Sequence, residues 1–144
     1  MNGIRTSVEK KLVAETDKIN AIPAFLHPYF IEIEARTCDF LRTHSEEYTG
    51  GSWNYYTLSN GGFFMAPCSH KFYTVSIPGN YFDAKIDAEA AGLISFLYAI
   101  NMVLAKQADM PDGPDEALLH FHNRVLAYAV SDTHYRVKIA CAID

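Results

Sequence analysis

Residues 48–67 read Tyr48-Thr49-Gly50-Gly51-Ser52-Trp53-Asn54-Tyr55-Tyr56-Thr57-Leu58-Ser59-Asn60-Gly61-Gly62-Phe63-Phe64-Met65-Ala66-Pro67, and this stretch decides the fold of the 144-residue chain. Extended to Phe82, it holds ten of the nineteen aromatic residues and only one formally charged residue, Lys71. Aromatic segments bracketed by glycine pairs are typical of strands joined by tight turns. The run Asn60-Gly61-Gly62 supplies the positive φ angles that a hairpin turn needs. We predict three antiparallel strands at 52–58, 62–67 and 71–77, the last closed by Pro78-Gly79-Asn80.

One long apolar helix is predicted after these strands. Asp87 is a good N-cap for a helix that runs to about residue 106 or 107. The helix has almost no polar face, so we expect it to be the central helix, buried against the sheet. Gly92 costs about 1 kcal/mol of helix propensity relative to alanine, and a close approach to a strand would explain its presence.

The other helices are predicted from apolar stripes and start signals. A helix from residue 29 to about 44 is indicated by a stripe at Phe30, Ile33, Thr37, Phe40 and Leu41. Pro114 suits the first helical position of another helix, with Asp115 and Glu116 in its first turn, near the positive end of the dipole. The tail at 133–144 fits both a strand and a helix, and we favour a short helix.

The N-terminal segment carries less pattern. We predict that residues 1–15 form a poorly ordered or extended arm and that Thr16-Asp17 caps a short helical turn. With 49% hydrophobic residues, the chain has enough apolar material for one core of ordinary size. We therefore predict a single α+β domain over residues 1–144, in which a small three-stranded antiparallel sheet packs against a buried central helix and further helices.

The charge and cysteine content exclude several classes of protein. The net charge is −5, from 17 acidic and 12 basic residues, which argues against a broad nucleic-acid-binding face. The three cysteines form no CxxC motif and no pairing framework, as expected of a reduced cytoplasmic protein. The longest apolar run, 90–105, falls short of a membrane span, so we expect a cytoplasmic protein without a membrane anchor. We also expect a monomer.

No motif indicates catalysis or a cofactor. His120 and His122 point about 200° apart on a helix, so they cannot hold one metal ion together. Cys68-Ser69-His70 places a thiol next to an imidazole, but without an orienting third group a turn between strands is the better interpretation. A zinc site built from the three cysteines and a histidine lacks any ligand pair at short spacing. The glycine pairs fit no phosphate-binding loop. We expect no catalytic residue, no metal and no cofactor.

Two groups of residues are candidates for binding a partner. Trp53, Tyr55 and Tyr56, followed by Phe63 and Phe64, could form a platform on which nucleic-acid bases stack. Such a platform normally comes with basic residues, and this stretch has only Lys71, so a core with one aromatic surface patch is the better interpretation. Asp109, Asp112, Asp115 and Glu116 could meet a basic partner, or they could form a solvated loop and helix start.

The run 48–67 resembles the signature of the ArdB/KlcA antirestriction proteins. The resemblance covers about residues 16–144, and it includes Ile22-Pro23-Ala24-Phe25, Pro78-Gly79-Asn80, Asp87-Ala88-Glu89-Ala90-Ala91-Gly92 and Ala142-Ile143-Asp144. It implies a small plasmid-borne or mobile-element protein that relieves cleavage of incoming unmodified DNA by type I restriction systems. Members of the family are not established enzymes.

Mimicry of DNA is the obvious mechanism for such a protein, but the charge is too small. A globule of this length is roughly 35–40 Å across, and matching a duplex over that span takes on the order of twenty negative charges. We therefore expect contact with the type I restriction-modification complex, or with a host factor controlling it. The residues expected to make this contact are Trp53, Tyr55, Tyr56, Asn60, Asp109, Asp112, Asp115, Glu116 and Asp144. The alternative is a single-stranded or duplex nucleic-acid-binding accessory protein of a mobile element, and an enzyme ranks third.

Overall fold

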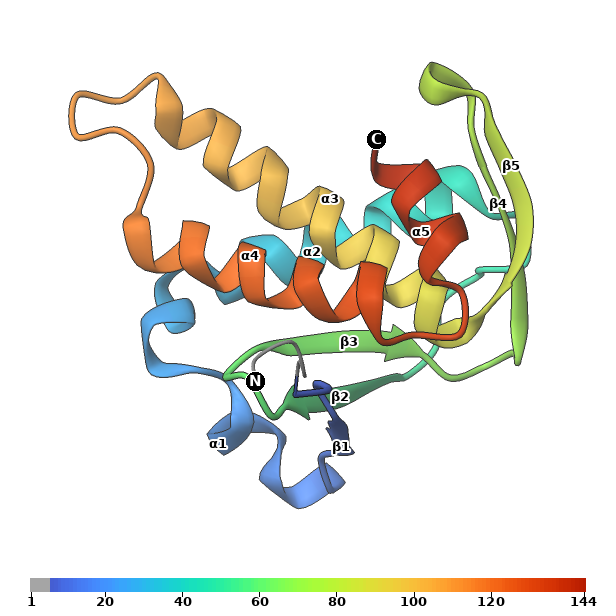
Figure 1. Ribbon diagram of the computed structural model, residues 1–144, viewed down its shortest axis with the longest axis horizontal. Coiled ribbons are helices and arrows are strands. Elements are labelled where there is room, and N and C mark those ends of the chain that lie inside the picture. The colour runs from blue at the N-terminus through green and yellow to red at the C-terminus, as the bar shows by residue number, and fades with distance from the viewer. Residues whose placement is uncertain (1–5) are drawn as a thin grey trace, which may run out of the picture.

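A computed structural model describes residues 6–144. The prediction of a poorly ordered or extended arm covers residues 1–15, and its first five residues lie outside the described part of the chain. The strands are β1 (Lys10–Leu12), β2 (Trp53–Leu58), β3 (Phe63–Pro67), β4 (Phe72–Ile77) and β5 (Phe82–Asp87). The α-helices are α1 (Lys18–Ala21), α2 (His27–His44), α3 (Ala88–Ala108), α4 (Glu116–Ser131) and α5 (Arg136–Ile143). Short 3-10 turns cover Glu15–Asp17, Ala24–Leu26 and Pro78–Asn80. In Figure 1, α2, α3, α4 and α5 form a layer over β2 and β3, and α1 lies below these strands, near β1. The β4–β5 hairpin stands at one end of the helical layer.

The first sheet has the order β1-β2-β3, and its strands are antiparallel. The register of β2 against β3 runs from Trp53 opposite Pro67 to Thr57 opposite Phe63, as the predicted hairpin requires. Gly61 has a φ of 89°, and the side-chain oxygen of Asn60 accepts a hydrogen bond from the Gly62 N–H at 3.0 Å. The extended arm contains β1, which pairs with the outer edge of β2.

The predicted third strand does not join this sheet. β4 instead pairs with β5, with Tyr73 opposite Ile86, in a separate two-stranded sheet. The sequence did not indicate β5, because three of its six residues are charged. The outward positions of β4 are exposed and the inward ones are buried, so this hairpin covers the core with one face only. The α+β class is confirmed, but the fold contains two small sheets.

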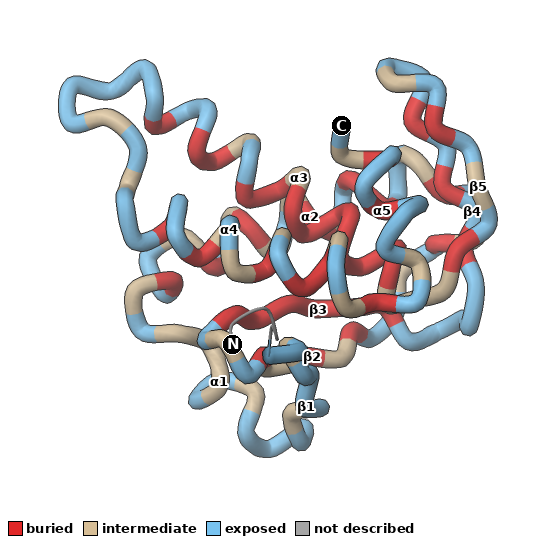
Figure 2. Tube along the Cα trace, in the orientation of Figure 1, coloured by how far each residue is buried: buried red, intermediate tan, exposed pale blue. Residues whose placement is uncertain are grey.

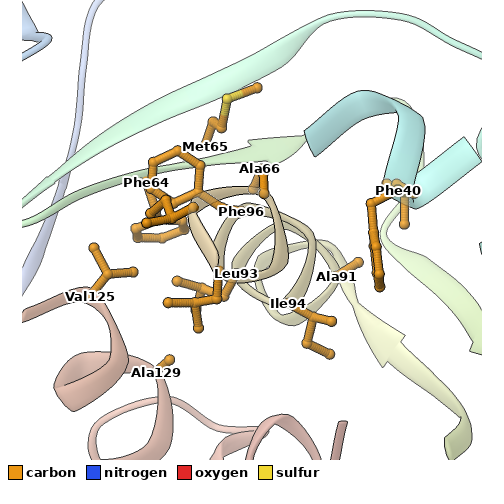
Figure 3. Packing of buried hydrophobic residues seen from close by; sticks show 14 of the residues in the cluster. Phe40, Phe64, Met65, Ala66, Ala91, Leu93, Ile94, Phe96, Val125 and Ala129 are labelled. Atoms are coloured by element: carbon orange, nitrogen blue, oxygen red, sulfur yellow. The ribbon is translucent and has the colours of Figure 1, made fainter. Parts of the chain in front are cut away.

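The central helix α3 is confirmed, including its start. The Asp87 carboxylate caps it by accepting a hydrogen bond from the Ala90 N–H at 2.8 Å. At 21 residues, α3 is long and apolar enough to cross a membrane by length and composition alone, but 67% of its most apolar window is buried inside the protein. Figure 2 shows this burial along the helix, and Figure 3 shows Leu93, Ile94 and Phe96 of α3 packed among core side chains. A core helix accounts for this composition.

Gly92 lies where α3 meets β3. A Cβ atom added at Gly92 would stand 2.5 Å from the Met65 carbonyl oxygen and 2.6 Å from the Ala66 Cα, which are both backbone atoms. The predicted close approach between helix and strand is therefore present, and it explains a glycine in the second turn of the helix.

The remaining helices follow the prediction with shifted starts. The second helix begins at His27, two residues earlier than expected, because Pro28 occupies its first turn, where a proline is tolerated. Asp115 is the N-cap of α4, so Pro114 precedes the helix and does not occupy its first position. Asp17 precedes α1 without a capping hydrogen bond from its side chain, contrary to the prediction. The short C-terminal helix is confirmed as α5.

Candidate functional site

The three aromatic residues expected to bind a partner do not form one exposed surface. Trp53 and Tyr55 are 7% and 8% exposed, on one face of β2, whereas Tyr56 lies on the other face. The Trp53 indole donates a hydrogen bond to the Tyr48 hydroxyl at 2.9 Å, and the Tyr55 hydroxyl donates to the Glu34 carboxylate at 2.8 Å. Burial and the nearby Glu34 raise the pKa of Tyr55 far above its ordinary value. Trp53 and Tyr55 thus serve the core.

Asn60 fastens the β2–β3 turn to α4. Its side-chain amide donates a hydrogen bond to the Arg124 carbonyl oxygen at 2.9 Å, while its side-chain oxygen accepts from Gly62. Both ends of the side chain are therefore engaged within the protein.

The acidic residues divide into one structural residue and several exposed ones. The Asp115 carboxylate accepts hydrogen bonds from the Ala117 and Leu118 N–H groups at 2.9 and 3.2 Å and from the Tyr29 hydroxyl at 2.6 Å. The Tyr29 hydroxyl, followed by the Leu118 N–H, holds the pKa of Asp115 below its ordinary value. The exposed acids are Asp109, Asp112, Glu116 and Asp144.

We expect Asp115→Ala to lower the free energy of unfolding by about 1–2 kcal/mol, because it removes the helix cap and the bond to Tyr29. Urea denaturation measures this loss, and Asp112→Ala is the control, because Asp112 is exposed in the same loop. The depressed pKa means that the ionised carboxylate stabilises the folded state. Its contribution is complete above the unfolded-state pKa of about 3.9 and disappears as the pH falls through the lower folded-state pKa. Equal losses from the two variants would contradict this assignment.

The tip of the β4–β5 hairpin combines an unusual backbone with an exposed aromatic side chain. Tyr81 has φ 61° and ψ 22°, and among residues 6–144 it is the single residue other than glycine with a positive φ. The residue is 95% exposed. A bulky residue in the left-handed region is a genuine outlier, and such outliers cluster at functional sites. The tip projects from the body of the molecule in Figure 1.

Asn80 fixes the tip to the C-terminal helix. Its side-chain oxygen accepts a hydrogen bond from the Phe82 N–H at 3.1 Å, and its amide donates to the Ala142 carbonyl oxygen. The Tyr98 hydroxyl of α3 donates to the same carbonyl oxygen at 2.8 Å. Two segments that the family resemblance singles out separately, Pro78-Gly79-Asn80 and Ala142-Ile143-Asp144, therefore meet here.

A cleft of about 720 Å³ lies beside the tip, between the C-terminal end of α2 and β4. Three acidic residues line it, Glu46, Glu47 and Asp83, with Arg42 as the single formally charged cation. The Glu47 carboxylate accepts hydrogen bonds from the Thr74 N–H at 3.0 Å and from the Ser45 hydroxyl at 2.9 Å. Burial opposes ionisation of Glu47, but these hydrogen bonds outweigh it and hold the pKa below its ordinary value. This site is not evident from the sequence, because no pattern predicts β5, which carries Asp83.

The residues considered for catalysis do not assemble. The Cys68 thiol donates to the Ser52 carbonyl oxygen at 3.1 Å, while the His70 ring lies edge-on to Tyr73. His120 is exposed and His122 is half-buried, and burial lowers the pKa of His122. Within residues 6–144, no group of three or more histidine, cysteine, aspartate or glutamate side chains is placed to hold a metal ion. The tip and its cleft offer a surface for binding.

Comparison with known proteins agrees with the family resemblance. The sequence model of the family described as "Antirestriction protein" matches residues 46–144. The antirestriction protein KlcA of Escherichia coli is 33% identical over 135 residues, which cover 92% of this chain and 90% of that protein. A second KlcA from Escherichia coli is 33% identical over 123 residues, covering 85% of this chain and 86% of the relative.

A solved structure gives the same relationship. It comes from a study of the KlcA and ArdB proteins, reported to show a novel fold and antirestriction activity against type I DNA restriction systems in vivo but not in vitro. The TM-score is 0.85 at 30% sequence identity, and the match covers 100% of both chains. The chain therefore belongs to the antirestriction protein family.

Proposed function

We propose that this protein relieves type I restriction of incoming unmodified DNA by binding the restriction-modification complex, or a host factor that controls it, and not by imitating DNA. The family relationship supports the antirestriction activity. The structurally similar proteins act in vivo but not in vitro, which is expected if a component of the cell takes part. The site of action is then the cytoplasm, where such DNA is cleaved.

The distribution of charge carries the proposed mechanism. Ion pairs within residues 6–144 place several acidic residues within 4 Å of a cationic group: Glu15 with Lys18, Glu32 with Arg36 and Lys106, Asp39 with Arg42, and Glu89 with Lys10. These pairs weaken the negative electrostatic potential of the surface, which is already small because the net charge is only −5. A DNA mimic of this size needs on the order of twenty negative charges in a regular array.

The tip and the acidic cleft form the surface that we assign to the partner. We define the tip surface as Pro78, Gly79 and Tyr81 together with the cleft acids Glu46, Glu47 and Asp83. An exposed tyrosine on a fixed backbone is a typical anchor of a protein interface, because it buries a large area at a low cost in conformational entropy. The exposed acids from the sequence prediction, Asp109, Asp112, Glu116 and Asp144, are candidates for a peripheral second contact that adds little to the affinity.

Plating of unmodified phage on cells that carry a type I restriction system tests the proposal. With the protein expressed, we expect the plating efficiency to rise toward that of cells lacking restriction. A pull-down from the same cells distinguishes a retained restriction subunit from a retained host factor. A folded protein that leaves the plating efficiency unchanged would remove the proposed activity. Retention of DNA alone would favour the nucleic-acid-binding alternative.

A further inference from the structure

The free edge of β4 opens into the acidic cleft. Thr74 donates its N–H to Glu47 and not to β5, so this N–H points away from the hairpin. Because the direction of hydrogen bonding alternates along an antiparallel strand, Ser76, two residues further on, presents its N–H to the same side. Thr74 and Ser76 are both exposed, and both line the cleft. The cleft therefore gives access to main-chain groups of a sheet edge.

Glu47 occupies the place of a missing strand. Its carboxylate oxygen stands 3.0 Å from the Thr74 nitrogen, where the carbonyl oxygen of a paired strand would accept the same hydrogen bond. Unprotected edges are a liability that proteins cover with charged groups or short segments, and a single glutamate side chain is a cover that can move aside. The volume beside it, about 720 Å³, leaves room for an added segment.

We propose that β4 takes up an extended segment of the partner protein as an additional strand, and that this segment carries basic side chains. This proposal rests on the proposed function, which supplies the identity of the partner. Main-chain hydrogen bonds to an exposed sheet edge are a recurring mode of peptide recognition, in which side-chain pockets give the specificity. Here the specificity comes from Glu46, Glu47 and Asp83, which outnumber the one arginine of the cleft. Tyr81 stands at the tip of the hairpin, three residues after Pro78, which lines the cleft.

Proline substitutions at two matched positions distinguish the role of the free edge of β4 from that of the outer edge of β5. Ser76→Pro removes an N–H from the free edge of β4, and proline is tolerated on edge strands. Lys85→Pro is the control, because Lys85 stands opposite Thr74 in the register and its N–H points to the other side of the hairpin. In the plating assay we expect Ser76→Pro to lose about ten-fold or more of the relief and Lys85→Pro to stay within about two-fold of the native chain. Equal relief by both variants would overturn the proposal.

A peptide titration of the native protein tests binding at the free edge of β4 without depending on antirestriction activity. The probe is a six-residue peptide of alternating lysine and valine, which matches the six residues of β4. We expect it to shift the amide NMR signals of Thr74 and Ser76 but not that of Lys85, and a glutamate-valine peptide to leave all three unchanged. Equal effects of the two peptides, or none at Thr74 and Ser76, would overturn the proposal.

Sedimentation of the native protein tests another occupant of the edge. A dimer that Ser76→Pro dissociates would overturn the proposal, because a second copy of this chain would then occupy the edge of β4. Failure of the native protein in the plating assay counts only against the proposed function.

Discussion

Gly92→Ala is expected to lower the free energy of unfolding by about 3 kcal/mol, although alanine is the better helix former. The added methyl group would stand within 2.6 Å of the Met65 carbonyl oxygen and the Ala66 Cα. Both are backbone atoms of β3, so no side-chain rotation can relieve the contact. Helix α3 would have to move away from the sheet, and the close packing between them would be lost. Chemical denaturation at equilibrium measures the effect.

Gly79→Ala is the matched control for this prediction. A Cβ atom at Gly79 would meet no atom within 4 Å, and the φ of this residue is not in the left-handed region. We expect a change within about 0.5 kcal/mol. If both variants unfold at the same denaturant concentration, the contact between Gly92 and β3 does not have the energetic weight that its geometry indicates.

Tyr81→Gly is expected to change stability and activity in opposite directions. Glycine adopts the left-handed conformation without the strain that a tyrosine carries, and a residue that is 95% exposed has little packing to lose. The free energy of unfolding should therefore rise by about 0.5–1 kcal/mol. If the exposed ring anchors the partner, relief of restriction should fall by about ten-fold or more, as for an interface hot spot. A thermal melt and the plating assay supply the two readouts.

Tyr81→Phe is the control that distinguishes loss of the aromatic ring from relief of backbone strain. It keeps the aromatic surface and the strained conformation, so we expect near-native stability and most of the relief. A Tyr81→Gly protein that relieves restriction as well as the native chain would show that the ring has no part in binding. The left-handed backbone would then be a property of the turn alone.

The sequence predicts the local elements well where one signal acts alone. The apolar run after Asp87 and the apolar stripe of α2 each identify a helix, because burial of one face decides both. Gly92 indicates the helix–strand contact correctly. Pro114 and Asp115 compete for the start of α4, and the carboxylate prevails because it satisfies two N–H groups of the first turn.

The candidate site could not be predicted in the same way, because it depends on contacts between distant residues. Asn80 meets Ala142 across 62 positions, and Glu47 meets Thr74 across 27. Neither pair has a spacing that a local pattern could show. Trp53 and Tyr55 illustrate the reverse error, since their residue types suit both an interface and a core, and only the folded chain shows that they are buried.

We propose that this protein acts by contacting another protein and not by resembling DNA. Neutralising the exposed acids of the α3–α4 loop region by D109N, D112N and E116Q tests it most directly, with Asp115 left intact as the cap of α4. In the plating assay, we expect this triple variant to keep relief within about two-fold of the native chain while Tyr81→Gly loses it. Loss of relief in the triple variant, with native relief by Tyr81→Gly, would contradict the account and restore charge mimicry as the mechanism.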